Sequence, residues 1–473
     1  MAERRVELTF DRGTLLLTAP GLEAADVPSG FVADGRAGGR YRATGMAYRR
    51  ALGQLRRLGY TVDDSARGYG EVALTAVAHR EPFPYQHAAL SAWLAAERRG
   101  CVILPTGAGK TFVAELAMAA VQRATLIVAP TLDLVAQWAR RLALAFRIEV
   151  GIVGGGSNEV SDVTVTTYDS AHLHMDRLGA RFGLVIFDEV HHLPSDAYRM
   201  AAELAIAPFR LGLTATPERA DGLHARLDEL VGPICFRLGV SDLRGQFLAD
   251  YAVVRIEVDL TPEERVEYDT AEALFRGFLA AQGIRLGAPN GWQSFLQASN
   301  RSDTGRAAFQ AYQAHRRIAL ANRAKLDVME ELFAEHAEDK IVYFAHDRGT
   351  VYDVSRRFLV PVITHETPVV ERKHWLEAIG DGRVRILGTS RVLNEGVDMP
   401  DVSVGIIHSG TGSPREHVQR LGRILRRGAN KRAVLYELVT ANTVDSRTSD
   451  RRRDHEAFDE TDDAAEDDEE VSC

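Results

Sequence analysis

The stretch Leu104-Pro-Thr-Gly-Ala-Gly-Lys-Thr111 decides the fold of the first half of the chain. It follows a short apolar run and precedes a helical pattern. Gly107 and Gly109 allow backbone N–H groups to turn toward phosphate oxygens, Lys110 can bring a positive charge to them, and Thr111 can ligate Mg²⁺. The usual motif begins with Gly and this one with Leu, so the strict pattern is missed by one residue. We therefore predict a phosphate-binding loop between a strand and a helix.

A second motif is the adjacent pair of carboxylates at Asp188 and Glu189, which directly follows the apolar run Leu184–Phe187. One carboxylate at the end of a buried strand can hold Mg²⁺, and its neighbour can accept a proton from an attacking water. An ordinary solvated Asp-Glu pair would not need an apolar run leading straight into it. The pattern is the one that a nucleotide site at a sheet edge requires. The role of the nearby His192 is left open.

Short apolar runs alternate with helical patterns on both sides of these motifs. Runs rich in Val, Ile and Leu without polar alternation predict parallel strands that are covered on both faces. They fall into two groups and therefore predict two α/β units. The first group is Val102–Leu104, Thr125–Ala129, Val163–Thr167, Leu184–Phe187 and Leu211–Thr214; the second is Ile341–Ala345, Val384–Gly388, Val402–Ile407 and Ala433–Leu438.

Residues 1–80 predict a small α+β domain. Val6–Phe10 and Thr14–Thr18 alternate around a Gly-containing turn of three residues, which is typical of a hairpin. We expect a helix at about 45–58 and a further strand near Val72–Val77. Arginines off the apolar stripe of this helix are either solvated or part of a nucleic-acid surface, and the sequence leaves both open: Arg49, Arg50, Arg56 and Arg57.

Two segments depart from the α/β pattern. Residues at roughly 262–325 are helical and charged without a strand signal, so we expect a helical insertion. Residues 443–473 lose hydrophobic periodicity and become acidic, so we expect a disordered tail.

The composition narrows the class of protein. The formal charge of −9 over 473 residues argues at first sight against a nucleic-acid partner, because phosphate contact needs cations. Residues 454–473 hold eleven Asp and Glu and no Lys or Arg, however, so removing them would change the charge from −9 to +2. Three dispersed cysteines argue against a disulfide framework, a zinc site and a four-cysteine iron–sulfur cluster. Because there is no membrane-length apolar run and no signal-peptide pattern, we expect a soluble, cytoplasmic protein.

Further segments, in order along the chain, resemble the motifs of superfamily 2 helicases. Tyr85-Gln86 resembles the adenine-reading glutamine upstream of the phosphate loop, and Ala129–Trp138 resembles motif Ia. Val165–Tyr168 resembles a strand-contacting segment, and Gly212–Pro217 is similar to motif III, which couples hydrolysis to movement. The resemblance implies DNA contact or coupling by Thr131, Thr167, Thr214 and Thr216.

Two more motifs of that superfamily lie in the second group of strands. Gly388–Ser390 and Asn394–Asp398 resemble motif V, and Gln419–Arg426 resembles motif VI. In motif VI, Arg420, Arg423 and Arg426 are spaced three apart and would share one side of a helix. There they either form a solvated basic face or stabilise charge on a phosphate. An arginine supplied by a second lobe would make hydrolysis depend on lobe closure. The resemblance spans about 82–440 and implies roles for Thr389, Gly396, Asp398, Gln419, Arg420, Arg423 and Arg426.

Within the superfamily the chain resembles the XPB branch in its compact archaeal form. Directly after motif III that branch carries an Arg-Glu-Asp loop implicated in opening the duplex. This sequence keeps Arg219 and Asp221 but has Ala220 between them, so it does not determine the strength of unwinding. By position, 262–325 corresponds to a thumb-like element that grips DNA, and 1–80 corresponds to a domain thought to sense distorted DNA.

These features predict two RecA-like parallel-sheet lobes with an ATP site in the cleft between them and a small N-terminal α+β domain. The expected boundaries are 1–80, 82–240, 241–442 with its insertion at 262–325, and the tail 443–473. The expected catalytic residues are Lys110, Asp188, Glu189, Gln419, Arg423 and Arg426. Those expected to bind ATP are Gln86, Pro105, Thr106, Gly107, Ala108, Gly109, Lys110, Thr111, Gly396 and Asp398, with Mg²⁺ on Thr111 and Asp188. Those expected to contact DNA or couple the sites are Thr131, Thr167, Thr214, Thr216, Arg219, Asp221 and Thr389.

The function expected from this resemblance is an ATP-dependent DNA helicase or translocase of nucleotide excision repair. It would act on forked, distorted or damaged duplex, with a separate nuclease as a further partner. The alternatives are the motor subunit of a restriction system and an ATP-controlled DNA clamp with little strand separation. An RNA helicase fits the insertion and the segment after motif III less well, and an XPD-type helicase would need four clustered cysteines.

Overall fold

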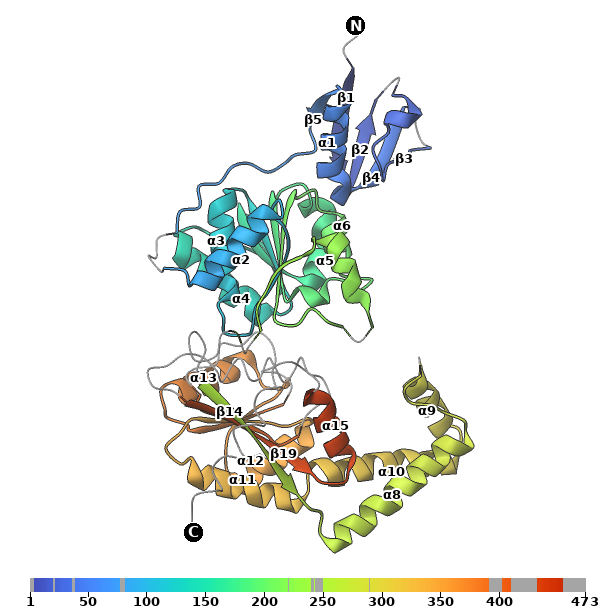
Figure 1. The fold of residues 1–473 in the computed structure, drawn as a ribbon, viewed down its shortest axis with the longest axis vertical. Helices are drawn as coiled ribbons and strands as arrows, with labels where there is room; N and C mark the ends of the chain where they lie inside the picture. Colours follow the sequence, from blue (N-terminus) through green and yellow to red (C-terminus); the bar gives the residue numbers. More distant parts are fainter. Residues whose placement is uncertain are drawn as a thin grey trace. The chain divides into compact units, whose positions relative to one another are not determined.

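The computed structural model describes residues 4–19, 22–35, 39–76, 81–219, 221–239, 242, 250–288, 290–390, 402–409 and 432–453. The chain divides into two compact units, Met1–Gly239 and Val240–Cys473, which are described separately (Figure 1). No helix in these described ranges combines the length and the apolar character needed to cross a membrane.

The first sheet is built from the N-terminal residues and has the strand order β3-β4-β2-β1-β5. The predicted hairpin is confirmed, since β1 and β2 pair in an antiparallel register that closes at Asp11 and Thr14. Alternate residues of both strands are buried, among them Leu8 and Leu15. The predicted helix is also confirmed. The elements are β1 (Arg5–Asp11), β2 (Thr14–Thr18), β3 (Val32–Ala33), β4 (Arg40–Thr44), α1 (Tyr48–Arg57) and β5 (Thr61–Asp64).

The strand predicted near Val72–Val77 is wrong over residues 72–76, which form no strand there. This segment is a connection that runs along the next domain and is held by one residue. The Gln122 side chain accepts a hydrogen bond from the Leu74 N–H (2.9 Å) and donates one to the Leu74 carbonyl (2.8 Å). A glutamine thus supplies the partners that a neighbouring strand would otherwise provide, which the apolar pattern alone could not reveal.

The second sheet carries the phosphate-loop motif and has the order β13-β6-β12-β11-β7-β10-β8-β9. All five strands predicted for this unit are confirmed and pair in parallel, while β8 and β9 form an antiparallel hairpin at one edge. Every residue of β7, β10 and β11 is buried, as expected for a sheet covered on both faces. The strands are β6 (Arg99–Ile103), β7 (Thr125–Ala129), β8 (Gly151–Gly154), β9 (Ser157–Asn158), β10 (Val163–Thr167), β11 (Leu184–Asp188), β12 (Phe209–Thr214) and β13 (Ile234–Arg237); the helices are α2 (Pro84–Ala95), α3 (Lys110–Val121), α4 (Leu132–Phe146), α5 (Tyr168–Leu178), α6 (Met200–Glu203) and α7 (Leu227–Leu230).

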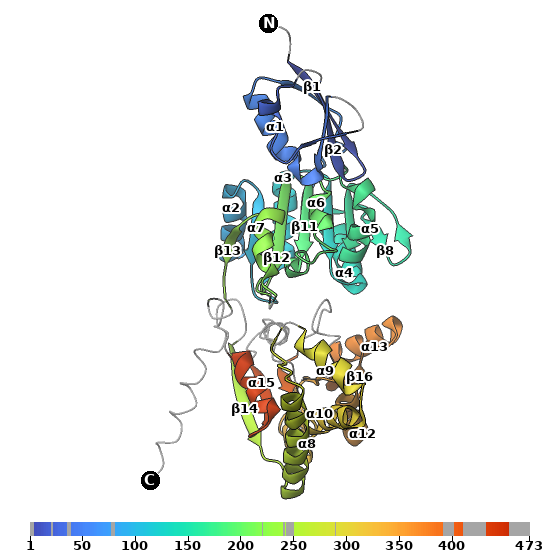
Figure 2. The same ribbon diagram turned by 90° about the vertical axis from the view of Figure 1, so that its right-hand side faces the viewer.

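The third sheet lies in the second unit and has the order β14-β19-β18-β15-β17-β16, with all neighbours parallel. The four predicted strands are confirmed as β15, β17, β18 and β19. The edge strand β14 pairs along its whole length with β19, the last strand, and lies beside α15 in Figure 2. The elements are β14 (Asp250–Val258), α11 (Arg323–Glu335), β15 (Ile341–Phe344), α12 (Arg348–Phe358), β16 (Val362–Ile363), α13 (Val369–Gly380), β17 (Ile386–Thr389), β18 (Val404–Ile407), β19 (Arg432–Thr440) and α15 (Val444–Arg453).

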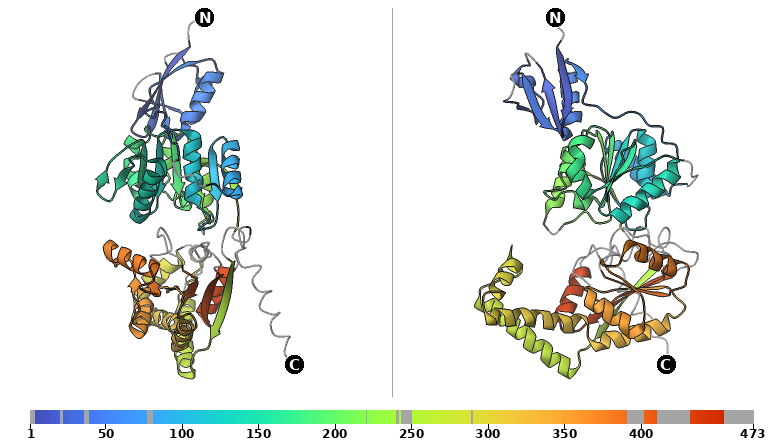
Figure 3. Two further views of the ribbon diagram at one scale, coloured as in Figure 1. Left: turned by 90° about the vertical axis from the view of Figure 1, so that its left-hand side faces the viewer. Right: turned by 180° about the vertical axis from the view of Figure 1, so that it is seen from behind.

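The predicted helical insertion is confirmed as an arm made of α8 (Pro262–Ala281), α9 (Gly291–Ser299) and α10 (Asp303–Leu320). The arm projects from the third sheet in Figure 1 and in the right-hand view of Figure 3. Its own core is aromatic, with the rings of Phe275 and Phe295 5.3 Å apart. The next helix, α11, packs instead against the core of the third sheet.

The expectation of a disordered tail from residue 443 is wrong for its first part, because residues 444–453 form the helix α15. Asp445 and Ser449 of this helix are fully buried. The sequence misled because α15 buries polar side chains that have partners within the fold, so it lacks an apolar stripe. Residues 454–473 lie outside the described residues.

Candidate nucleotide site and its coupling residues

The phosphate-loop segment has the backbone that phosphate binding requires. Gly107 and Gly109 adopt positive φ angles of 86° and 80°, which favour glycine, and α3 begins at the next residue, Lys110. The N-terminus of a helix together with inward-turned N–H groups forms a binding site for anions. The local geometry therefore fits the phosphates of a nucleotide.

Two residues of α2 hold this loop through hydrogen bonds to its main chain. The Tyr85 hydroxyl and the Gln86 Nε2 both donate to the Ala108 carbonyl, at 2.8 Å and 3.0 Å. The other end of the Gln86 amide, Oε1, accepts from the Phe83 N–H at 3.0 Å, and the side chain is fully buried. A Cβ atom on Gly109 would lie 2.5 Å from Gln86 Nε2, so this glycine is required by packing as well as by φ. In this conformation Gln86 holds the loop, a role that the sequence reasoning did not predict.

The functional side chains of the loop have few partners among the described residues. The Lys110 ammonium donates to the carbonyl of Leu104 at 3.2 Å, at the start of the same loop. The Thr106 hydroxyl oxygen is buried and has no hydrogen-bond partner in the part of the chain that the structure describes. Thr111 follows on the first turn of α3 and is partly exposed. A cation and an unpartnered hydroxyl at a helix N-terminus fit a polyphosphate chain.

The carboxylate of Asp188 lies at the end of β11 and is held by two donors. Trp138 Nε1 of α4 donates to one oxygen at 2.7 Å, and the Glu189 N–H donates to the other at 3.0 Å. The Tyr168 hydroxyl donates to the Asp188 main-chain carbonyl at 2.9 Å. Burial and then the charge of Glu189 raise the pKa of Asp188 to about 6, although Trp138 and Lys110 oppose this rise. Such a buried carboxylate near a lysine is a natural ligand for a divalent cation.

Glu189 is fixed in a sparsely populated backbone conformation, with φ at +45°. Its carboxylate accepts a hydrogen bond from the Thr214 hydroxyl at 3.1 Å, and His191 Nδ1 lies 3.0 Å from that same hydroxyl. The Thr216 N–H donates back to the Thr214 oxygen at 3.2 Å. Backbone strain of this kind persists where the surrounding structure imposes it and is concentrated at functional sites. Thr214 therefore links the acidic pair to the segment that follows β12.

A second set of hydrogen bonds, made by Arg219, begins at the main chain of His191. The Arg219 guanidinium donates to the His191 carbonyl at 2.7 Å and makes two hydrogen bonds to Asp221, at 2.5 Å and 2.9 Å. These hydrogen bonds hold the pKa of the Asp221 carboxyl well below its usual range. Arg219 thus connects the acidic pair with the loop that bears Asp221, and most of its donors are already used within the protein.

Comparisons with known proteins identify the family. Residues 8–66 match the Xeroderma pigmentosum group B helicase damage recognition domain. Residues 79–219 match the family described as type III restriction enzyme, res subunit, and residues 324–428 match the helicase conserved C-terminal domain. A DNA 3'-5' translocase XPB2 of Sulfurisphaera tokodaii is 42% identical over 370 residues, which cover 78% of this chain and 84% of that protein. The chain belongs to the XPB family of superfamily 2 helicases.

Other relatives of this XPB-type chain agree with that assignment. A DNA 3'-5' helicase XPB of Mycobacterium tuberculosis is 30% identical and is covered over 68% of its length, while 84% of this chain is covered. Among solved structures, the Pyrococcus furiosus Hef helicase domain aligns with a TM-score of 0.54 at 18% identity, over 78% of this chain and 97% of that chain. At that identity the likeness shows the fold alone, namely RecA-like lobes.

The predicted DNA-contacting threonines of this XPB-type chain have structural roles in the described residues. Thr131 and Thr167 are the N-caps of α4 and α5, where their hydroxyls accept from the Leu134 and Ser170 N–H groups. Thr389 ends β17 and is fully buried. Six residues with predicted roles lie outside the described residues, as does Ala220: Gly396, Asp398, Gln419, Arg420, Arg423 and Arg426.

Three arginines of α1, namely Arg49, Arg50 and Arg57, line a cavity of about 760 Å³ in the first unit of this XPB-type chain. Arg49 pairs with Glu97 at 2.7 Å, whereas no ion pair is found within the described residues for Arg50 or Arg57. Arg99 lines the same cavity, and burial and then the charges of Arg49 and Arg50 lower its pKa. Carboxylates of Asp228 and Glu229 also line this cavity, so its charge is mixed.

Proposed function

We propose that this chain is an ATP-dependent DNA helicase or translocase that remodels duplex DNA in nucleotide excision repair. The observation that supports it best is the hydrogen bond from the motif III threonine, Thr214, to Glu189 of the acidic pair, in a chain that also matches a damage recognition domain. A site that hydrolyses ATP and passes its state along hydrogen bonds is what a nucleic-acid motor needs.

The ATP-binding residues are assigned as follows in this proposal. The backbone of Gly107–Lys110 and the Lys110 ammonium hold the phosphates, and Thr111 and Asp188 hold Mg²⁺. No cluster of three His, Cys, Asp or Glu in the described part of the chain is placed to hold a metal. Mg²⁺ would therefore depend on the nucleotide phosphates for its remaining ligands, as is usual for this ion. Glu189 positions the attacking water.

The Lys110→Ala variant tests this site. We expect loss of DNA-stimulated ATP hydrolysis, because the charge on the phosphates is removed, with DNA affinity kept within about threefold. The matched control is Lys340→Met, which removes a lysine that donates to the Gly380 carbonyl, far along the chain from the loop. Normal turnover by Lys110→Ala would refute the assignment.

The direction of movement is part of the same proposal. Relatives of this chain are named DNA 3'-5' helicases or translocases, and we propose 3'-5' polarity here. Strand displacement on duplexes with a single 3' or 5' tail would check it, with displacement from the 3' tail as the expected result. The match of residues 79–219 to a restriction subunit concerns a shared motor domain; the damage recognition domain at 8–66 favours repair. A separate nuclease partner stays a prediction from the resemblance.

An ATP-controlled clamp with little strand separation is the second candidate. It is favoured by Ala220 in place of the glutamate and by the engagement of Arg219 within the protein. ATP hydrolysis and strand displacement measured on the same forked duplex would separate the two functions. Strong hydrolysis without displacement would identify the clamp.

A further inference from the structure

The cavity beside α1 lies at the opposite end of β6 from the phosphate loop. Arg99, the first residue of β6, lines the cavity, whereas the loop begins directly after Ile103, the last residue of that strand. At about 3.3 Å per residue, the two ends of the strand are roughly 13 Å apart. All the lining residues belong to the first compact unit. The nucleotide site described above therefore does not use this cavity.

The walls of the cavity are joined by Arg49 of α1. Its guanidinium donates to the Glu97 carbonyl at 3.0 Å and pairs with the Glu97 carboxylate at 2.7 Å. Glu97 and Arg98 form the turn before β6, and both have positive φ angles, of 55° and 61°. Residues other than glycine rarely adopt such angles, and strain of this kind is concentrated at functional sites. Arg49 thus fixes α1 to a strained turn, which gives the cavity walls of defined geometry.

Three further guanidinium groups line the cavity without a carboxylate partner. No ion pair is found for Arg50 or Arg57 among the described residues, and Arg99 donates to main-chain carbonyls. Burial and then the charges of Arg49 and Arg50 lower the pKa of Arg99. Like charges that are held close together repel each other, and an anion in the cavity would relieve that repulsion.

Gly53 opens the surface of α1 between two of these arginines. Residues 50, 53 and 57 lie on one face of the helix, because they are separated by three and four positions. Glycine inside a helix is less favourable than alanine. Yet the φ angle of Gly53 is not positive, and a Cβ atom there would meet nothing within 4 Å. Neither the backbone nor the packing requires this glycine, and its effect is to leave room between Arg50 and Arg57.

Carboxylates limit where in the cavity an anion can lie. Glu97 is engaged by Arg49, but Asp228 and Glu229 of α7 have no ion pair among the described residues and would repel an anion. Neither of these two carboxylates is among the groups that shift the pKa of Arg99. The walls formed by α1 and the start of β6 are therefore the favourable ones.

We propose that this cavity binds phosphate groups. Guanidinium groups make charge-assisted, often bidentate hydrogen bonds to phosphate. Arg50 and Arg57 lie two turns apart on α1, about 10.5 Å along its axis, so one ligand that reaches both carries more than one phosphate. Inorganic polyphosphate and a nucleic-acid strand share this chemistry. The site is separate from the proposed ATP hydrolysis and does not depend on it.

Chemical modification of arginine, read residue by residue, tests this proposal on the full chain. Phenylglyoxal reacts with guanidinium groups, and mass spectrometry of peptides gives the initial rate at each arginine. The probe is inorganic tripolyphosphate. Arg56 is the internal control, because it is exposed on the same helix and does not line the cavity. At about ten times its dissociation constant, tripolyphosphate should slow modification of Arg50 and Arg57 by about fivefold or more and leave Arg56 unchanged.

A glycine variant tests the cavity without removing a charge. Gly53→Leu places a side chain between Arg50 and Arg57, and leucine favours the helix. Tripolyphosphate should no longer slow the modification of these two arginines in this variant. The matched control is Gly277→Leu on α8, because a Cβ atom on that exposed glycine also meets nothing within 4 Å. Protection should persist in the control, and thermal unfolding shows that both variants fold.

Further arms of the experiment identify the source of the phosphate groups. Protection by a single-stranded oligothymidylate would assign a nucleic-acid strand, and protection by tripolyphosphate alone would assign a small polyphosphate. Protection should also persist in Lys110→Ala, which separates the cavity from the phosphate loop. Three results would each overturn the inference: equal slowing at Arg56, no slowing with either probe, or protection that is kept in Gly53→Leu or lost in Lys110→Ala. A chain that fails to hydrolyse ATP would overturn the proposed function alone.

Discussion

At the scale of single residues, the acidic pair depends on donors that lie far away in the sequence. Trp138 donates to the Asp188 carboxylate itself, whereas Tyr168 donates only to its main-chain carbonyl. A hydrogen bond to the ionised form of a carboxyl lowers its pKa, so the two donors differ in their effect on titration although they lie on adjacent helices.

This difference gives a prediction about pH. In Trp138→Phe the ionised form of Asp188 loses a donor, so its pKa should rise further above about 6. If the ionised carboxylate is the active form, hydrolysis is lost as pH falls through that pKa, and the acid limb of kcat/KM should move to higher pH. The pH profile checks this. Tyr168→Phe is the control and should leave the limb in place; an equal shift in both variants would contradict the assignment.

A second prediction concerns Thr214. Thr214→Val keeps the side-chain shape and removes the hydroxyl that joins Glu189, His191 and Thr216. We expect DNA stimulation of hydrolysis to fall on the order of tenfold, since each lost hydrogen bond is worth about 1 kcal/mol. Thr166→Val is matched to it, because Thr166 is buried on β10 and donates only to carbonyls away from the pair. Measuring the ATPase rates of both variants with and without DNA checks this prediction.

At the level of single residues, the sequence predicts which residues belong to the site but not the hydrogen bonds that hold them. Lys110, Asp188 and Glu189 could be found because apolar strands lead directly into their motifs. The sequence motif points to Gln86, but it does not predict the hydrogen bond from Gln86 to the phosphate loop. Hydrogen bonds between distant segments leave no periodic signal in the sequence. Trp138 lay inside a motif assigned to DNA contact, and nothing in the sequence indicated that its indole reaches Asp188 across 50 positions.

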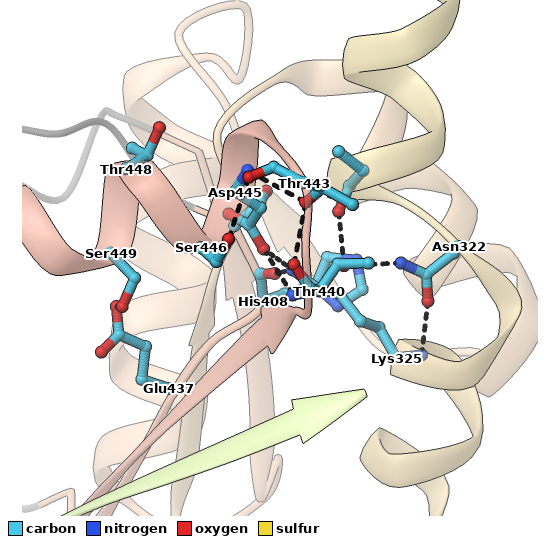
Figure 4. Close-up of polar contacts among 12 residues, drawn as sticks. Asn322, Lys325, His408, Glu437, Thr440, Thr443, Asp445, Ser446, Thr448 and Ser449 are labelled. Carbon is cyan, nitrogen blue, oxygen red and sulfur yellow. Dashed lines mark hydrogen bonds and ion pairs between the residues drawn. The ribbon is translucent and has the colours of Figure 1, made fainter. Parts of the chain in front are cut away.

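At the scale of elements, the helix α15 shows where a prediction from hydrophobic periodicity fails. The parallel strands were predictable because continuous apolar runs distinguish them from solvent-facing segments. The short strands β8, β13 and β16, which lie at or next to a sheet edge, carry no such run and are partly exposed, so the apolar pattern does not predict them. The helix α15 looks like a tail in the sequence because the side chains that it buries are polar, among them Asp445, which pairs with a lysine 120 positions away (Figure 4).

Truncation of the chain separates the helix from the acidic residues that follow it. A chain ending at residue 443 lacks Asp445 and leaves Lys325 buried without its counter-ion, which should lower the free energy of unfolding of the second unit by about 3–5 kcal/mol. A chain ending at residue 453 should unfold like the full-length protein. Thermal and urea unfolding of both would check this, and equal stability of the two truncations would show that α15 contributes nothing.

At the scale of the whole molecule, charge is concentrated at one end. Residues 454–473 carry eleven acidic and no basic side chains, and the remaining chain has a formal charge of +2. An anionic segment of the same chain competes with DNA phosphates for cationic surface, and salt weakens that competition.

Deleting residues 454–473 should therefore tighten non-specific DNA binding several-fold at low salt, and the gain should shrink as salt is raised. ATP hydrolysis at saturating DNA should not change. Binding measured at two or more salt concentrations checks this prediction. An affinity that is unchanged at low salt would show that the acidic segment acts on solubility instead.

The pairing of β14 with β19 has a consequence for how the protein folds while it is being synthesised on the ribosome. Among the strands that the structure describes, Asp250–Val258 is the first of the second unit, and it pairs with the last, Arg432–Thr440. While roughly 180 intervening residues are being synthesised, at about 5–20 residues per second, β14 has no neighbour and must wait for about 10–40 seconds. The first unit, Met1–Gly239, is compact by itself and is complete before that interval begins, so we expect it to fold meanwhile. Chaperone capture should therefore be greatest for nascent chains that end between β14 and β19.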